Sequence, residues 1–118
     1  MLYTNLKHLE TAADYAKFIS ENENVMLVCG RMDPMSISVY GIAEQFEVEY
    51  KHVKFCDIEF DNPESYIVRE LEVIQDLRSI PFTIYYKNGK VAFTTSGIQT
   101  KTEVKAILDK EFAVTVNV

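Results

Sequence analysis

A short, continuous apolar run at residues 25–29 constrains this 118-residue chain most strongly. Unbroken runs of this length are typical of strands that are buried on both faces. Asp33 and Pro34 follow soon after, and an Asp N-cap with Pro at the first helical position predicts a helix, which ends near Glu49. Since residues 52–60 predict a second buried strand, this helix should be the crossover between two parallel strands.

Three further helices are predicted from caps and apolar spacing. Thr11 caps one helix, and residues 100–103 form a capping box that opens the last one. Asn62 followed by Pro63 predicts a third, extended helix, which runs toward Asp76.

A hairpin follows this third helix. Residues 82–86 and 91–95 are rich in β-branched and aromatic residues, and they flank the pair Asn88 and Gly89. Asn-Gly favours a type I′ turn, so the two strands should pair antiparallel.

The order of elements predicts the fold class. Two strands separated by helices and a terminal hairpin indicate an α/β fold, with a mixed central sheet of four to five strands and helices on both faces. A short strand at residues 2–3 would complete the sheet, and the apolar tail at residues 113–118 would add an edge strand or fray. Without a linker or a repeat, we expect one domain over residues 1–118.

Composition argues against several classes of partner. The formal net charge of −6 disfavours nucleic acid and anionic membrane surfaces, because both require a basic surface. No apolar run reaches the length of a membrane span, and the N-terminus lacks the apolar core of a secretion signal. The two cysteines, Cys29 and Cys56, lie in apolar runs and give no disulfide framework. We therefore expect a cytoplasmic protein that binds neither nucleic acid nor membrane.

Two segments together resemble the thioredoxin family. In that family, the segment matching residues 25–36 ends in Cys-Gly-Pro-Cys, and the segment matching residues 78–93 carries Ile-Pro before an Asn-Gly hairpin. The resemblance covers roughly residues 10–112 and implies a thioredoxin fold. It also implies a cis peptide bond before Pro81, opposite the motif, and a role for Gly97 in the approach of a partner backbone.

The departures from the family fall on its chemistry. The four motif positions are occupied, in order, by Met32, Asp33, Pro34 and Met35. A thioether cannot form the disulfide that dithiol exchange requires. Arg31 stands in place of the Trp before the motif, and Met26 stands in place of the buried Asp that serves the family as a proton acceptor.

We expect the family's substrate groove to persist as a partner-binding surface. Its residues are Arg31, Met32, Met35, Ile80, Pro81, Gly97 and Ile98. Methionine is flexible and polarizable, which suits adaptable binding surfaces. The resemblance thus implies a redox-inactive protein that binds another protein or itself, since some thioredoxin-like proteins without the cysteines act as chaperones or assembly accessories, one group of them in hydrogenase maturation.

An oxidoreductase with atypical thiols is the alternative. The strands of Cys29 and Cys56 should be neighbours, so the two thiols could form a displaced redox pair, but apolar surroundings favour a structural role. Met32 and Met35 alone offer too few ligands for a soft metal such as Cu(I), so no metal and no cofactor is expected.

The remaining polar residues have simple interpretations. Asp33 is either a plain N-cap or a site for an anion or a partner, and the cap is favoured because Pro follows it. The acidic runs at residues 44–49 and 57–61 are most simply solvated faces. His8 and His52 are interpreted as surface or packing residues.

Overall fold

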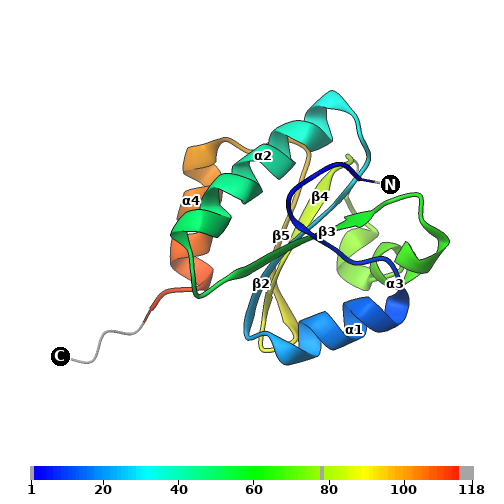
Figure 1. Cartoon of the computed structure of the whole chain (residues 1–118), viewed down its shortest axis with the longest axis horizontal. Helices are drawn as coiled ribbons and strands as arrows, with labels where there is room; N and C mark the ends of the chain where they lie inside the picture. Colours follow the sequence, from blue (N-terminus) through cyan, green and yellow to red (C-terminus); the bar gives the residue numbers. More distant parts are fainter. Residues whose placement is uncertain (1, 78, 115–118) are drawn as a thin grey trace.

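The computed structural model describes residues 2–77 and 79–114, in which a five-stranded mixed sheet lies between two layers of helices (Figure 1). The strands lie in the order β1 (Lys7–His8), β3 (Lys54–Glu59), β2 (Asn24–Gly30), β4 (Phe82–Lys87) and β5 (Lys90–Ser96). Strands β1, β3 and β2 are parallel, whereas β4 runs antiparallel to both β2 and β5. The predicted α/β architecture is confirmed.

Helices cover both faces of the sheet. Helix α1 (Ala12–Glu21) and the short α3 (Tyr66–Arg69) lie on one face, and α2 (Pro34–Glu49) and α4 (Lys101–Glu111) lie on the other (Figure 1). Helices α1, α2 and α4 begin at the predicted caps, Thr11, Asp33 and Thr100.

The caps satisfy backbone N–H groups that have no partner within the first helical turn. The Thr11 hydroxyl accepts from the N–H of Asp14 at 3.0 Å, and the Asp33 carboxylate accepts from the N–H of Ser36 at 2.8 Å. At α4, Thr100 and Glu103 exchange side-chain and backbone hydrogen bonds, which is the predicted capping box.

The apolar run in β2 is explained by its central place in the sheet. Val25, Leu27 and Cys29 belong to the core cluster beneath α1 and α3. Met26 and Val28 belong to the cluster beneath α2 and α4. All five side chains are inaccessible to solvent, because successive side chains of a strand alternate between two covered faces.

The predicted hairpin is present and has the expected turn. Asn88 and Gly89 both have positive φ, at 52° and 79°, as a type I′ turn requires. The ladder between β4 and β5 carries an irregularity between Tyr85 and Tyr86.

The prediction of an extended third helix is wrong. A 3₁₀ turn, η1 (Pro63–Ser65), leads into the single turn α3, and a second 3₁₀ turn, η2 (Glu72–Ile74), follows after an interruption. At the interruption Leu71 is extended, with φ −60° and ψ 136°, and the side-chain amide of Gln75 donates to the carbonyls of Arg69 and Leu71. The break brings both Val68 and Ile74 into the core cluster beneath α1 and α3.

The first strand also lies elsewhere than predicted. Pairing begins at β1, opposite Cys56 and Asp57, and not at residues 2–3. The Thr4 hydroxyl accepts from the N–H of Leu6, which turns the backbone, while Leu2 and Leu6 bury their side chains. At the other end, residues 113–114 form no strand, and residues 115–118 of the predicted edge strand lie outside the described residues.

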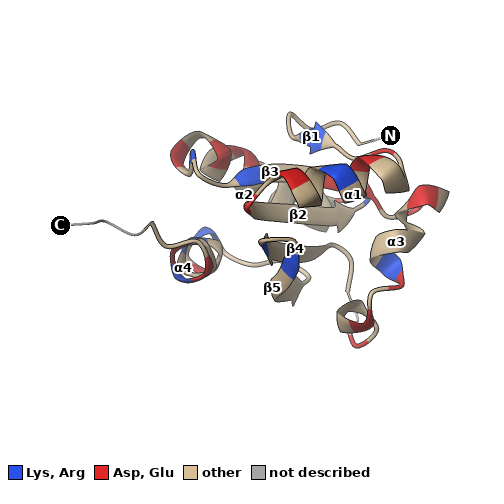
Figure 2. Ribbon diagram, turned by 90° about the horizontal axis from the view of Figure 1, so that it is seen from below, with Lys and Arg blue, Asp and Glu red and all other residues tan. Residues whose placement is uncertain are grey.

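Both signs of charge lie on the helices. Acidic and basic residues are interspersed along α1 and α4 (Figure 2). Over residues 2–77 and 79–114, none of the helices has the length and apolar character needed to cross a membrane.

The junction between β2 and α2 is tightly packed around Gly30. A Cβ atom at this position would lie 2.7 Å from both Ser36 Oγ and Tyr40 Oη. Both hydroxyls are held in place, because Ser36 accepts from the N–H of Arg31 at 3.2 Å and Tyr40 donates to the carbonyl of Arg31 at 3.0 Å. The absent side chain of Gly30 thus allows α2 to approach the end of β2.

Two alanine substitutions should therefore have opposite effects. Gly30→Ala should lower the free energy of unfolding by about 1–3 kcal/mol, because the new methyl group overpacks the junction. Gly41→Ala, inside α2 with no atom within 4 Å of the new Cβ, should raise it by about 0.5–1 kcal/mol. Urea unfolding followed by circular dichroism measures both, and a neutral Gly30→Ala would contradict this packing.

Candidate functional site

The end of β2, the start of α2, the loop before β4 and the loop after β5 converge at one end of the sheet. The Ile80–Pro81 peptide bond is cis, and the carbonyl of Pro81 accepts from the N–H of Gly97 at 2.7 Å. Gly97 has a φ of 74°, which favours glycine, and its missing Cβ would lie 4.0 Å from Cε of Met35. The structure thus brings Pro81, Gly97 and Met35 together.

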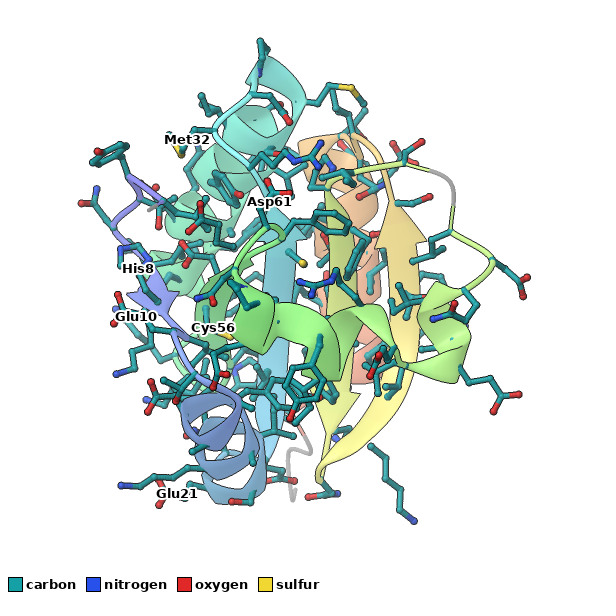
Figure 3. All side chains as sticks on the ribbon, turned by 90° about the vertical axis from the view of Figure 1, so that its right-hand side faces the viewer. His8, Glu10, Glu21, Met32, Cys56 and Asp61 are labelled. Atoms are coloured by element: carbon teal, nitrogen blue, oxygen red, sulfur yellow. The ribbon has the colours of Figure 1, made fainter. Side chains whose placement is uncertain are left out.

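Met32 has a different neighbour. Its sulfur accepts a hydrogen bond from the backbone N–H of Tyr3 at 3.3 Å, so the N-terminal segment reaches the motif. Figure 3 shows Met32 beside this segment. Met32, Met35 and Ile98 are 40%, 42% and 52% exposed, which leaves three apolar side chains at this end of the molecule partly open to solvent.

The Arg31 side chain forms an ion pair with Asp61. Its Nε and Nη2 atoms donate to the two carboxylate oxygens of Asp61 at 2.7 and 3.0 Å, and the guanidinium lies 5.1 Å from the ring centroid of Phe60. Hydrogen bonding by Arg31 lowers the pKa of Asp61. The Arg31 side chain therefore covers Phe60 and has its charge balanced locally.

Ile80 and Pro81 contribute less open surface than the methionines. Pro81 is buried and Ile80 is half-buried. Ile80 also lines a cavity of about 300 Å³, whose other walls are Phe60, Arg69, Ile74, Gln75, Leu77, Ser79 and Phe82. The cis-Pro loop is thus bordered by this cavity as well as by Met35.

The structure supports the simple interpretation of Asp33. Its carboxylate accepts from the N–H of Ser36 and its carbonyl from the N–H of Ile37. Both contacts belong to the first turn of α2, so Asp33 serves as the N-cap.

Both cysteines lie inside the sheet. Cys29 and Cys56 are inaccessible to solvent and unpaired, and their strands are adjacent, as the sequence predicts. They are out of register, because Cys29 lies opposite Ile58 and Cys56 lies opposite Leu27. Burial raises the pKa of both thiols above the ordinary value, which disfavours the thiolate that exchange chemistry needs.

Sequence reasoning misses one polar cluster. Asp57 belongs to an acidic run that is expected on a solvated face, but its side chain is buried, and burial raises its pKa. His8 is a lone histidine in the sequence, but its Nδ1 lies 2.7 Å from Asp57 Oδ1. The sequence places these residues 49 positions apart, and only the register of β1 against β3 brings them together. His52 keeps a packing role, with Nε2 2.8 Å from the carbonyl oxygen of Phe112.

Among the described residues, no group of three or more His, Cys, Asp or Glu side chains is arranged to hold a metal ion.

The fold is similar to solved thioredoxin structures. Plasmodium falciparum thioredoxin matches with a TM-score of 0.76 at 20% identity, over 90% of this chain and 99% of that one. Oxidised mitochondrial thioredoxin 3 of Saccharomyces cerevisiae matches with 0.73 at 13% identity, over 89% of this chain and 94% of that one. A mutant thioredoxin of Halobacterium salinarum matches with 0.78 at 12% identity, over 98% of this chain and 100% of that one.

These similarities establish that the chain has a thioredoxin fold. By sequence, no family model and no curated protein matches. Since identities at this level define the fold alone, function has to be argued from the site itself.

The buried cysteines lead to a labelling prediction. In native protein at pH 8, both thiols should react with a bulky aromatic disulfide at least roughly 100-fold more slowly than in urea-unfolded protein, because reaction requires the sheet to open. Absorbance of the released thiolate gives both rates. Rapid labelling of the native chain, lost on Cys29→Ser or Cys56→Ser, would show that the corresponding thiol is accessible.

Proposed function

We propose that this protein is a redox-inactive binding module that uses the end of its thioredoxin fold to hold another protein or a second copy of itself. One observation carries the proposal. At the start of α2, where the thioredoxin family has thiols, the chain has two exposed thioethers, Met32 and Met35, while Cys29 and Cys56 are buried in the sheet.

The open side chains suit association. Met32, Met35 and Ile98 are each at least 40% exposed, and burying such apolar area against a partner is favourable. Methionine can adjust its rotamers to differently shaped partners. The groove consists of Arg31, Met32, Met35, Ile80, Pro81, Gly97 and Ile98.

The backbone around Gly97 supports a groove at this position. Gly97 lies between Met35 and Ser79. A Cβ atom added at Gly97 would lie 4.0 Å from Cε of Met35 and 3.7 Å from Cβ of Ser79. An extended segment of a partner can approach the backbone there more closely than a larger residue would allow. A chaperone or assembly accessory in the cytoplasm is the role that agrees best with such a surface.

The alternative, an oxidoreductase that uses Cys29 with or without Cys56, has less support. Exchange needs a thiolate that can reach a disulfide. Both thiols are inaccessible, their pKa values are raised by burial, and they do not lie directly opposite one another.

We predict no disulfide reductase activity. Turbidity from insulin reduction by dithiothreitol should develop at the uncatalysed rate when this protein is added, because it has no exposed dithiol. Catalysis above that rate that disappears in Cys29→Ser would favour the oxidoreductase instead.

We predict that binding depends on the two motif methionines. The double variant Met32→Asp/Met35→Asp should lose self-association, or capture of a partner from the native host, by at least about tenfold, because two charges would have to be desolvated at the interface. Sedimentation velocity over a concentration series measures self-association, and immobilised protein measures capture.

The matched control is Val48→Asp/Val73→Asp. These valines are 67% and 46% exposed and lie outside the groove, so this control changes the charge equally without touching the proposed site. A partner lost equally from both double variants would indicate a charge effect. Unchanged binding in the methionine variant would exclude the groove.

A further inference from the structure

Arg69, the last residue of α3, is a half-buried cation that pairs with no carboxylate among the described residues. Its Nη1 atom donates to the carbonyls of Phe60 and Asn62 at 2.6 and 2.9 Å, so this nitrogen is already used. The other two nitrogens, Nε and Nη2, have no hydrogen-bond partner in the part of the chain that the structure describes. The carboxylate of Asp61 is committed elsewhere, because both of its oxygens accept from Arg31. Arg69 therefore keeps two donors for an acceptor that no described residue supplies.

Arg69 also lines the cavity of about 300 Å³ beside the cis-Pro loop. The interruption of the third helix places residues of both α3 and η2 at this cavity, and α3 lies on the side of the molecule that faces the viewer in Figure 3. The walls are mostly apolar and consist of Phe60, Ile74, Leu77, Ile80 and Phe82. Of the described residues in the lining, Arg69 alone is charged. Mainly apolar walls with a few polar groups are typical of small-molecule sites, whose volumes begin at roughly 300 Å³.

Two uncharged polar residues, Gln75 and Ser79, complete the lining. The side-chain amide of Gln75 donates to the carbonyls of Arg69 and Leu71 at 2.8 and 3.2 Å, so it offers a ligand no further donor. Ser79 is exposed, and its hydroxyl has no partner within the described residues. The donors that remain are the Ser79 hydroxyl and the Nε and Nη2 atoms of Arg69. A complementary ligand must therefore bring acceptors together with apolar surface.

We propose that this cavity binds a small monocarboxylic acid with an apolar chain. The carboxylate would accept from Nε and Nη2 of Arg69, which are the two atoms that Arg31 uses to hold Asp61. The chain of the acid would pack against the apolar walls. The site involves neither Met32 nor Met35, so its test is independent of the proposed function.

A free acid suits this cavity better than the carboxyl end of a protein. The peptide groups of a protein chain need hydrogen-bond partners when they leave water, and walls of Phe, Ile and Leu supply none. A short alkyl chain carries no such groups.

Titration of the ¹⁵N-labelled full chain, followed by amide chemical shifts, tests the proposal. Hexanoate is the probe, and hexanamide is the control that has the same chain without the charge. The tripeptide acetyl-Gly-Gly-Leu, with a free carboxylate, represents the end of a protein chain. The titrations are made at pH 7, where the carboxylates are ionised, in a buffer that contains no other carboxylate.

Hexanoate should produce saturable shifts centred on residues 69–75 and 79–82, with a dissociation constant of roughly 1 mM or lower. Hexanamide should bind at least about tenfold more weakly, because it lacks the charge that strengthens hydrogen bonds from Arg69. The tripeptide should also bind more weakly than hexanoate.

Two variants test the assigned residues. Arg69→Gln should weaken hexanoate binding at least about tenfold, because the paired donors and the charge are lost. Gln75→Glu places a carboxylate in the lining, which competes for Arg69 and repels the acid, and should weaken binding roughly three- to fivefold. The matched control is Gln45→Glu, an exposed position in α2 on the opposite face of the sheet, which should change binding by no more than about twofold.

Four results would overturn the proposal. These are the absence of saturable shifts for hexanoate up to about 20 mM, equal binding of hexanamide, binding of the tripeptide at least as tight as that of hexanoate, or equal weakening by Gln75→Glu and Gln45→Glu. If Arg69→Gln unfolds because the bonds from Nη1 are lost, the comparison of the two glutamine variants remains decisive, since both positions are exposed.

Discussion

Strand β2 is buried on both faces, and the positions of most other elements depend on this. Its five core side chains, at residues 25–29, alternate between two apolar clusters. Removing either layer of helices would therefore expose two or three of them. The strand also pairs with β3 on one side and with β4 on the other. The carboxyl end of β2 is therefore a fixed point, from which the motif at residues 32–35 enters α2.

The start of α2 is held against β2 by packing and hydrogen bonds. Gly30, Ser36 and Tyr40 hold the start of α2 against β2, and Asp33 caps it, without any contribution from a thiol. The two cysteines of this chain are core residues, whereas Met32 and Met35 are partly exposed.

The N-terminal segment contacts both β3 and the motif at residues 32–35. Thr4 and His8 anchor it to Asp57, and its Tyr3 N–H donates to the sulfur of Met32. The same short segment therefore lies along β3 and also borders the motif.

The sequence by itself determined the elements whose signals are local. Caps at Thr11, Asp33 and Thr100 and the Asn88–Gly89 turn depend on contacts within a few residues, so their chemistry can be recognised in the sequence. The buried run in β2 was equally clear. Only the tertiary structure decided the break in the third helix, the start of β1, and the pairing of His8 with Asp57. Each depends on which distant residues share a core face or a strand register, and neither propensity nor spacing encodes such long-range contacts.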